Sequence, residues 1–214
     1  MLNKIWVFLM QKVIPNIKWE SLTALFKGGK YWSLTEEDWD VLRKLLKEDY
    51  FIILTRRNSH FTTYAIAILE WIKRGKLSHY SHALINIEGD DIKSDKDFIL
   101  VEATSPGTHT STFMQVFDCD SVCLLRPKHF SKEDWDKCVA KVISDIGKPY
   151  DIDGNLSDDS KLTCAELDRD GLKQVPDYIK EFPNFEAMAE KHKIAMPQMY
   201  YDSGDFEIVF EVRR

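Results

Sequence analysis

Residues 80–88 read YSHALINIE, in which a histidine comes just before a short apolar run, ALINIE. Three later runs, FILVEA (98–103), TFMQVF (112–117) and SVCLLR (121–126), are also apolar or alternate with polar residues. The turn residues GDD, SPG and DCD separate the four runs, a spacing typical of antiparallel strands. The sequence therefore predicts an antiparallel meander sheet, with FIILT (51–55) as a further buried strand.

Helical patterns flank these strands. Thr35, Ser59 and Ser131 are good N-cap residues for helices over 35–48, 59–74 and 131–147, and apolar residues recur at helical spacing in each. The apolar side of the second helix consists of Ile66, Leu69, Trp71 and Ile72. Near the end of the chain we expect a helix over 184–193 and a strand over 206–212. The predicted class is α+β, a meander sheet packed against helices.

Composition restricts the class of protein. The chain has 214 residues, 44% of them hydrophobic, which suits one globular domain with a sizeable core. The net charge is −6 and the cations are dispersed, so no basic patch for nucleic acid is expected. Four cysteines in a chain of this length indicate free thiols in a reducing compartment rather than a disulfide scaffold.

The first residues contain the apolar run IWVFLM, Ile5 to Met10. It is shorter than the roughly 7–15 residues of a signal-peptide core, and no small-residue cleavage site follows it. No segment approaches the roughly 20 apolar residues of a membrane span. We expect a helical arm packed on the domain, with membrane-surface binding as the alternative, and a cytoplasmic location.

Cys164 is the candidate nucleophile, within KLTCAELDRDGL. Thr163 is an N-cap candidate, so the thiol would lie in the first turn of a helix. There the free N–H groups and the helix dipole favour a thiolate and an oxyanion. The position follows a long polar loop, which should leave the thiol open to a ligand. The alternative is a packed structural cysteine, because Cys is among the most buried residue types.

His82 and Glu102 are the candidate partners of this thiol. His82 is one of six histidines and stands at the end of a predicted strand, where a side chain is held rigidly but can reach a cleft. Glu102 is an acid in the apolar strand FILVEA, and a buried carboxylate needs a partner. If the two strands are neighbours, their ends can meet. A hydrogen-bonded structural histidine and a solvent-facing acid are the alternatives.

Four motifs in chain order, YSHALINIE, LVEATSPG, GKPYD and LTCAEL, resemble those of the permuted papain-like amidases. This group is related to the NlpC peptidases and the lecithin:retinol acyltransferases. The resemblance covers residues 50–170 and implies a permuted papain-like, NlpC-type fold in one domain over 1–214. It leaves an amino-terminal arm, 1–48, and a carboxy-terminal extension, 172–214, whose Tyr200–Tyr201 pair could wall the cleft. Ala165 departs from the serine that many members have there.

By this resemblance, Cys164 is the nucleophile, His82 the base and Glu102 its orienting partner. The implied function is a cysteine hydrolase, an amidase, peptidase or esterase that works through a thioester and needs no cofactor. Tyr150, in GKPYD, could present its hydroxyl to substrate or oxyanion, or could be a core tyrosine. The expected substrate is a peptide or a lipid acyl compound. Two alternatives are a lipid acyltransferase or thioesterase with the same triad, and a non-catalytic binding module of phage or viral origin.

Metal sites are weaker hypotheses. Cys119, Cys123 and His129 have a C-x3-C spacing with no second cysteine pair, which does not match a structural zinc site. His79 and His82 form H-x-x-H, which could bind a metal together with Glu102 or Cys164, but no metallohydrolase motif surrounds them. We therefore expect no metal. The sequence leaves the oligomeric state open.

Overall fold

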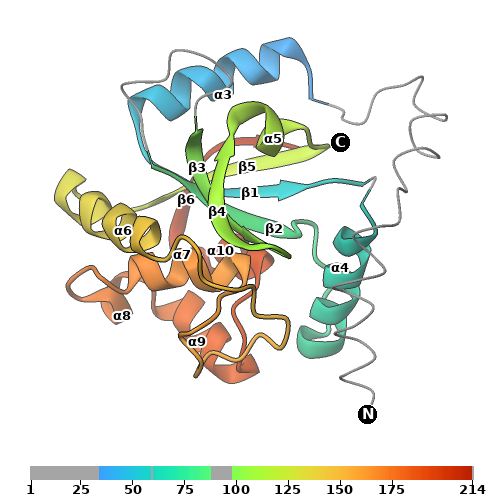
Figure 1. Ribbon diagram of the computed structural model, residues 1–214, viewed down its shortest axis with the longest axis vertical. Helices are drawn as coiled ribbons and strands as arrows, with labels where there is room; N and C mark the ends of the chain where they lie inside the picture. The colour runs from blue at the N-terminus through green and yellow to red at the C-terminus, as the bar shows by residue number, and fades with distance from the viewer. Residues whose placement is uncertain (1–33, 59, 88–97, 214) are drawn as a thin grey trace.

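The computed structural model describes residues 34–58, 60–87 and 98–213, and a six-stranded sheet lies at its centre (Figure 1). The strand order is β4–β3–β2–β1–β5–β6, and all neighbouring strands are antiparallel. The strands are β1 (Ile52–Arg56), β2 (His82–Asn86), β3 (Phe98–Thr104), β4 (Gly107–Thr112), β5 (Ser121–Pro127) and β6 (Phe206–Val212). The α+β class and the antiparallel sheet are thus confirmed.

Strands β1 to β4 form the meander, which differs from the predicted one in two places: the run 112–117 is not a strand, and the run 121–126 is β5, which pairs with β1. Residues 112–117 were expected to be a strand, whereas Phe113–Phe117 is the short helix α5. A capping box explains this. The Thr112 hydroxyl accepts from the Gln115 N–H, and the Gln115 side chain accepts from the Thr112 N–H. The strand after β3 is instead β4, which includes His109 and was not predicted.

Helices cover both faces of the sheet (Figure 1). One face carries α3 (Glu36–Glu48) and α5, and the other carries the helices from α6 onward. These are α6 (Lys132–Ser144), α7 (Cys164–Leu172), α8 (Tyr178–Glu181), α9 (Pro183–His192) and α10 (Pro197–Ser203). Thr35, Ser131 and Thr163 each begin their helix with a capping box, as predicted from their residue types.

Coverage on both sides explains the near-continuous apolar strands. In β1, Ile52 and Leu54 belong to the core beneath α7, whereas Ile53 belongs to the core beneath α3. All three side chains are fully buried. A strand that is buried on both faces has no polar side, and so its sequence shows little alternation.

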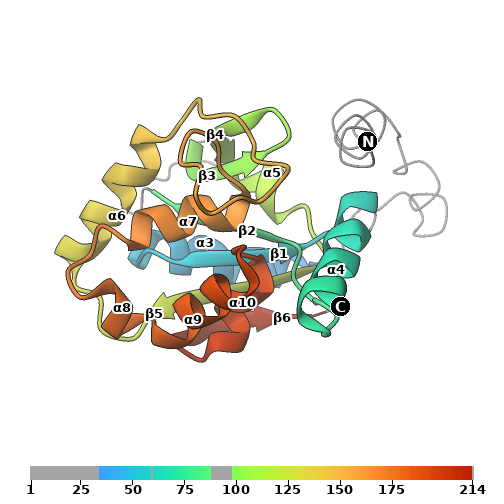
Figure 2. The same cartoon turned by 90° about the horizontal axis from the view of Figure 1, so that it is seen from below.

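The helix α4 (Phe61–Arg74) lies at the side of the molecule, beyond the ends of β1 and β2 (Figures 1 and 2). The prediction that Trp71 and Ile72 belong to the buried side of this helix is wrong, because they are 56% and 67% exposed. Small and polar side chains face inward instead, among them Ala65, Ala67 and Glu70. The predicted cap, Ser59, lies outside the described residues, and the observed N-cap is His60.

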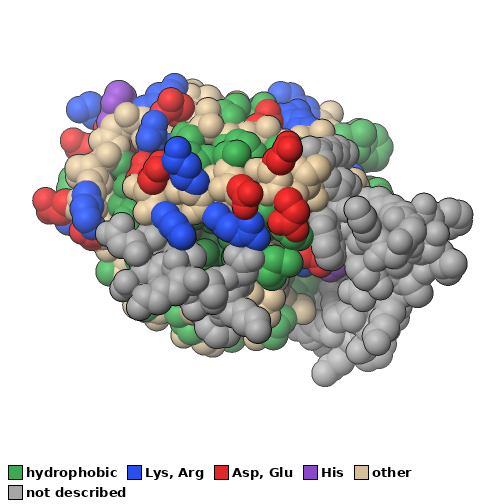
Figure 3. All heavy atoms as spheres, turned by 90° about the horizontal axis from the view of Figure 1, so that it is seen from above, with side chains coloured by type: hydrophobic (Ala, Val, Ile, Leu, Met, Phe, Trp, Pro, Cys, Tyr) green, Lys and Arg blue, Asp and Glu red, His purple; other side chains and the backbone are tan. Residues whose placement is uncertain are grey.

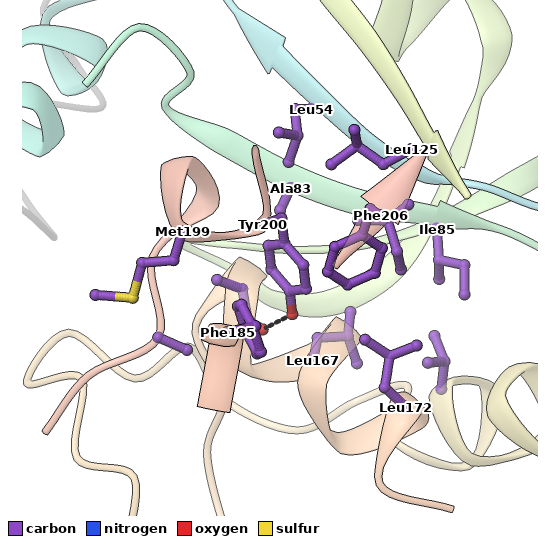
Figure 4. Packing of buried hydrophobic residues seen from close by; sticks show 14 of the residues in the cluster. Leu54, Ala83, Ile85, Leu125, Leu167, Leu172, Phe185, Met199, Tyr200 and Phe206 are labelled. Carbon is purple, nitrogen blue, oxygen red and sulfur yellow. Dashed lines mark hydrogen bonds between the residues drawn. The ribbon is translucent and has the colours of Figure 1, made fainter. Parts of the chain in front are cut away.

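Residues 172–214 are part of the core rather than an extension around it. Phe185, Tyr200 and Phe206 pack together beneath the sheet (Figure 4). Tyr200 is fully buried, and its hydroxyl donates to the backbone oxygen of Ala165 at 2.7 Å. The expectation that Tyr200 walls a cleft is therefore wrong. This tyrosine supports the helix that begins at Cys164.

Close packing also fixes α7 against α6. A Cβ added at Gly171 would lie 2.7 Å from the Cys138 sulfur and 2.8 Å from a Val142 methyl carbon. No side chain larger than hydrogen fits there without a shift, so the two helices approach closely at this glycine.

The first segment of the chain was expected to form a helical arm over 1–48. Residues 1–33 lie outside the described part of the chain. The remainder is chiefly α3, whose Trp39, Leu42 and Leu46 are buried in one of the two cores. Among the helices that the structure describes, none is both long and apolar enough to cross a membrane.

Replacing Tyr200 with Phe should destabilise the fold by about 1 kcal/mol, because the ring packing is kept but a buried hydrogen bond to α7 is lost. Urea denaturation measures this change. Tyr64→Phe is the matched control, since its hydroxyl also donates to a backbone oxygen but its side chain is exposed. The control should change stability by less than about 0.5 kcal/mol. Equal effects of the two variants would contradict the supporting role of Tyr200.

Candidate active site

The start of α7 is fixed by its neighbours in the chain. The Thr163 hydroxyl accepts from the Glu166 N–H at 3.1 Å, and the Glu166 carboxylate accepts from the Thr163 N–H at 2.8 Å. Leu167 N–H makes the first backbone hydrogen bond of the helix, to Thr163. Cys164 therefore occupies the first helical position. Its N–H group and that of Ala165 precede the first bonded turn, where helix donors lack an intrahelical acceptor.

A loop brings Tyr150 beside this helix start. Tyr150 and Leu162 form a parallel bridge, with Asp151 N–H donating to Leu162 and Leu162 N–H donating to Pro149. Both ends of the acidic loop are thus held together. The Lys161 ammonium lies 3.0 Å from the Asp151 carboxylate and offsets part of the negative charge of this loop. The Tyr150 side chain consequently reaches the Cys164 thiol and hydrogen-bonds it.

His82 and Glu102 meet across neighbouring strands, as the sequence suggested they could. The strands β2 and β3 pair antiparallel, with Ile85 opposite Val101. His82 Nε2 lies 2.6 Å from Glu102 Oε2. The Cys164 side chain is the other neighbour of the His82 ring and, together with Glu102, raises the pKa of that ring. The structure thus places Cys164, His82 and Glu102 together, and the Tyr150 side chain is a further neighbour of the thiol.

Two residues of β4 extend this group, and the sequence reading missed both. The Ser111 hydroxyl donates to Glu102 Oε1, and His109 Nε2 lies 3.7 Å from the same oxygen. Glu102 faces His109 directly in the strand register. The signal was the alternation THTST over 108–112, in which threonine recurs at every second position. Side chains two apart share a face, so recognising this strand would have placed His109 and Ser111 beside Glu102.

Charge favours an ionised His82–Glu102 pair. Burial by itself lowers the pKa of His82, but the hydrogen bonds and negative charges of Cys164 and Glu102 outweigh it and raise the pKa to about 10. Burial likewise raises the pKa of Glu102, but the His82 contact outweighs it, and Ser111 and His109 add to this effect, lowering the pKa to about 2. At neutral pH the pair is therefore an imidazolium and a carboxylate.

Asp168 is a second feature that the sequence reading missed. It lies one helical turn after Cys164, is fully buried, and neither of its carboxyl oxygens has a hydrogen-bond partner among the described residues. Burial raises the pKa of Asp168 well above its usual range, the Cys164 charge adds to this, and His82 opposes it. A neutral carboxyl group therefore lies under the thiol. The i, i+4 spacing in CAELD is the signal that places it there.

Accessibility differs from the sequence expectation. Cys164 was expected to be open to a ligand but is only 3% exposed. The His82 side chain keeps 24% exposure, so it is the more accessible member of the pair.

The other three cysteines are free but buried. Cys119 belongs to the predicted DCD turn, yet it is fully buried. Burial raises the pKa of Cys119 and of Cys123 to about 12, and that of Cys138 well above its usual range. In the described parts of the chain, no group of three or more His, Cys, Asp or Glu side chains is placed to hold a metal ion.

NMR titration of the histidine rings should find a midpoint for His82 well above 6.5, near 10, because both of its partners favour the imidazolium. His79 serves as the internal reference, since burial lowers the pKa of that ring below 6.5. Glu102→Gln and Cys164→Ala should each shift the His82 midpoint to lower pH and leave His79 unchanged. A midpoint near 6.5 in the unmodified protein would show that the ion pair is not formed.

No family model matches the chain, and no curated protein matches it. Among solved structures, it is similar to the crystal structure of the metalloprotein yiiX from Escherichia coli O157:H7, a DUF1105 protein. The two share 14% sequence identity, with a TM-score of 0.55, and the match covers 78% of this chain and 98% of that one. At this identity the likeness extends to the fold alone.

Proposed function

We propose that the chain is a cysteine hydrolase that cleaves an amide or ester through a thioester on Cys164. One observation carries the proposal, the grouping of Cys164, His82 and Glu102 at the first turn of a helix. A nucleophile, a base in contact with it, and a third group that orients the base are the parts that such catalysis requires. We further propose that the fold is papain-like in permuted order, because the chain supplies these residues as His, Glu, then Cys.

The resting charge state determines the first step. Since Glu102 occupies Nε2 of His82, the other ring nitrogen is left for the thiol. A protonated imidazole in this position stabilises a Cys164 thiolate. The sulfur attacks the carbonyl carbon of the substrate, a C–S bond forms, and the carbonyl electrons move to oxygen. The N–H groups of Cys164 and Ala165 are the donors available at the helix start for this oxyanion.

The remaining steps return the enzyme to its starting state. The His82 imidazolium gives its proton to the leaving nitrogen or oxygen, that C–N or C–O bond breaks, and the acyl group stays on Cys164. Neutral His82 then takes a proton from water, the resulting hydroxide attacks the thioester, and Cys164 leaves as a thiolate. Tyr150 hydrogen-bonds the sulfur and is placed to assist its departure.

The low exposure of Cys164 favours a second candidate, an acyltransferase or thioesterase that acts on lipid. In that reaction the acyl group passes from sulfur to an alcohol or amine, or to water, with the same three residues. A thioester shielded from solvent survives until an acceptor enters the site.

Thiol labelling tests the proposed role of Cys164. At pH 6, iodoacetamide should modify Cys164 well before the other three cysteines, because burial holds those three as thiols. Peptide mass spectrometry over time reports the order. His82→Ala should slow labelling of Cys164 by at least about tenfold, since the imidazolium favours the thiolate.

The matched control is His79→Ala, which removes a nearby histidine that is not among the groups perturbing the site. It should leave the labelling rate unchanged. If Cys119 reacts first, or if all four cysteines react alike only above pH 8, Cys164 is not an activated nucleophile.

A further inference from the structure

The exposed face of α4 is unusually apolar. Ten large hydrophobic side chains are exposed in the described parts of the chain, and five of them belong to α4 and the turn that follows it. They are Tyr64 (47% exposed), Ile68 (53%), Trp71 (56%), Ile72 (67%) and Leu77 (74%). The four helical residues recur at the spacing of one helix side, so they form a continuous stripe rather than scattered contacts. We call these five residues the α4 stripe.

The exposed charged side chains of the α4 segment itself are cationic, and the neighbouring acid, Asp202, is paired with Arg74. Between residues 61 and 77 the acidic residue is Glu70, which is fully buried and lies 3.2 Å from Arg74. The exposed charged residues on this segment are Lys73 and Lys76. By contrast, acidic and basic side chains are interspersed on the face shown in Figure 3. The α4 stripe is therefore an apolar surface with a cationic border.

The inner side of α4 holds the helix in place by polar contacts. Arg74 binds both the Glu70 and the Asp202 carboxylates, and Glu70 also accepts from the Gln198 N–H. The Ser81 hydroxyl donates to Thr63 at 3.1 Å. These contacts leave the large apolar residues directed outward without loosening the helix, so their exposure does not result from poor packing.

We propose that the α4 stripe docks on the surface of a membrane that contains anionic lipids. Trp, Tyr and Ile side chains insert at the boundary between headgroups and acyl chains, and lysines beside them bind anionic headgroups. The proposal does not depend on the proposed activity, because a surface can bind lipid whether or not Cys164 reacts.

The main competing occupant is the amino-terminal segment of the same chain. Residues 1–33 are rich in apolar side chains and carry Lys4, Lys12, Lys18, Lys27 and Lys30 against one acid, Glu20. A cationic segment does not complement the cationic border of the α4 stripe. Both sequences complement an anionic surface, and charge therefore favours lipid over the segment as the occupant.

Vesicle co-sedimentation of the full chain tests the proposal, with Cys164→Ala as the protein so that turnover has no part in the result. Binding is expected to vesicles of phosphatidylcholine with 30% phosphatidylserine, and to weaken at high salt. The double variant W71S/I72S should lower binding at least about tenfold, because two apolar anchors are lost. K73E/K76E should lower it by a similar factor. The matched control is Ile179→Ser, which removes a side chain of similar exposure (61%) on α8.

Thermal melts and circular dichroism establish that each variant is folded. Three outcomes would overturn the proposal. The full chain does not bind the anionic vesicles; or it binds, and W71S/I72S and I179S behave alike; or W71S/I72S changes only the sedimentation of a dimer. The second outcome assigns binding to another segment, and the third assigns the α4 stripe to a second copy of the chain.

Discussion

The capping box at the start of α7 is the interaction on which the site depends. The side chains of Thr163 and Glu166 each accept a hydrogen bond from the backbone N–H of the other residue. These two bonds determine that the helix begins at Cys164 rather than a residue earlier or later. A shift of one residue turns a helix by about 100°, which would direct the thiol away from His82. The same helix is held from below by Tyr200 and from the side at Gly171. Capping sets the position of the sulfur, and core packing keeps it there.

The groups around that thiol include a buried pair of opposite charges, His82 and Glu102. Burial disfavours both the imidazolium of His82 and the carboxylate of Glu102, but Cys164 and Glu102 together favour the imidazolium, and His82 favours the carboxylate. Breaking a buried pair leaves an uncompensated charge, which destabilises more than the intact pair stabilises. Asp168, which has no such partner, is kept neutral by burial. The site therefore holds one ion pair, His82 and Glu102, and the neutral carboxyl group of Asp168 adds no charge to it.

The sequence predicted the parts of this structure that local chemistry controls. Thr163, an N-cap type, placed Cys164 at a helix start, and the lone acid in FILVEA pointed to Glu102. It failed at one local signal, the Thr112–Gln115 capping box, which makes an alternating run the helix α5. It also failed where contacts distant in sequence decide: Tyr200 was expected to wall the cleft, but its hydroxyl is buried against Ala165 of α7. Trp71 and Ile72 have the spacing of a core face, but the helix is anchored by Glu70 and Arg74 on its other side. Periodicity gives the relative positions of apolar residues and does not show which side another element will cover.

Trapping an acyl-enzyme tests the central claim most directly. The protein would be incubated with p-nitrophenyl esters of acetate, octanoate and palmitate, quenched in acid, and analysed by mass spectrometry as intact protein and as peptides. The account predicts a mass increase equal to the acyl group on the peptide that contains Cys164. It also predicts no adduct in Cys164→Ala, and far less in His82→Ala. Folded protein that carries no acyl group with any of these donors, or that carries it on Cys119, Cys123 or Cys138, would contradict the claim.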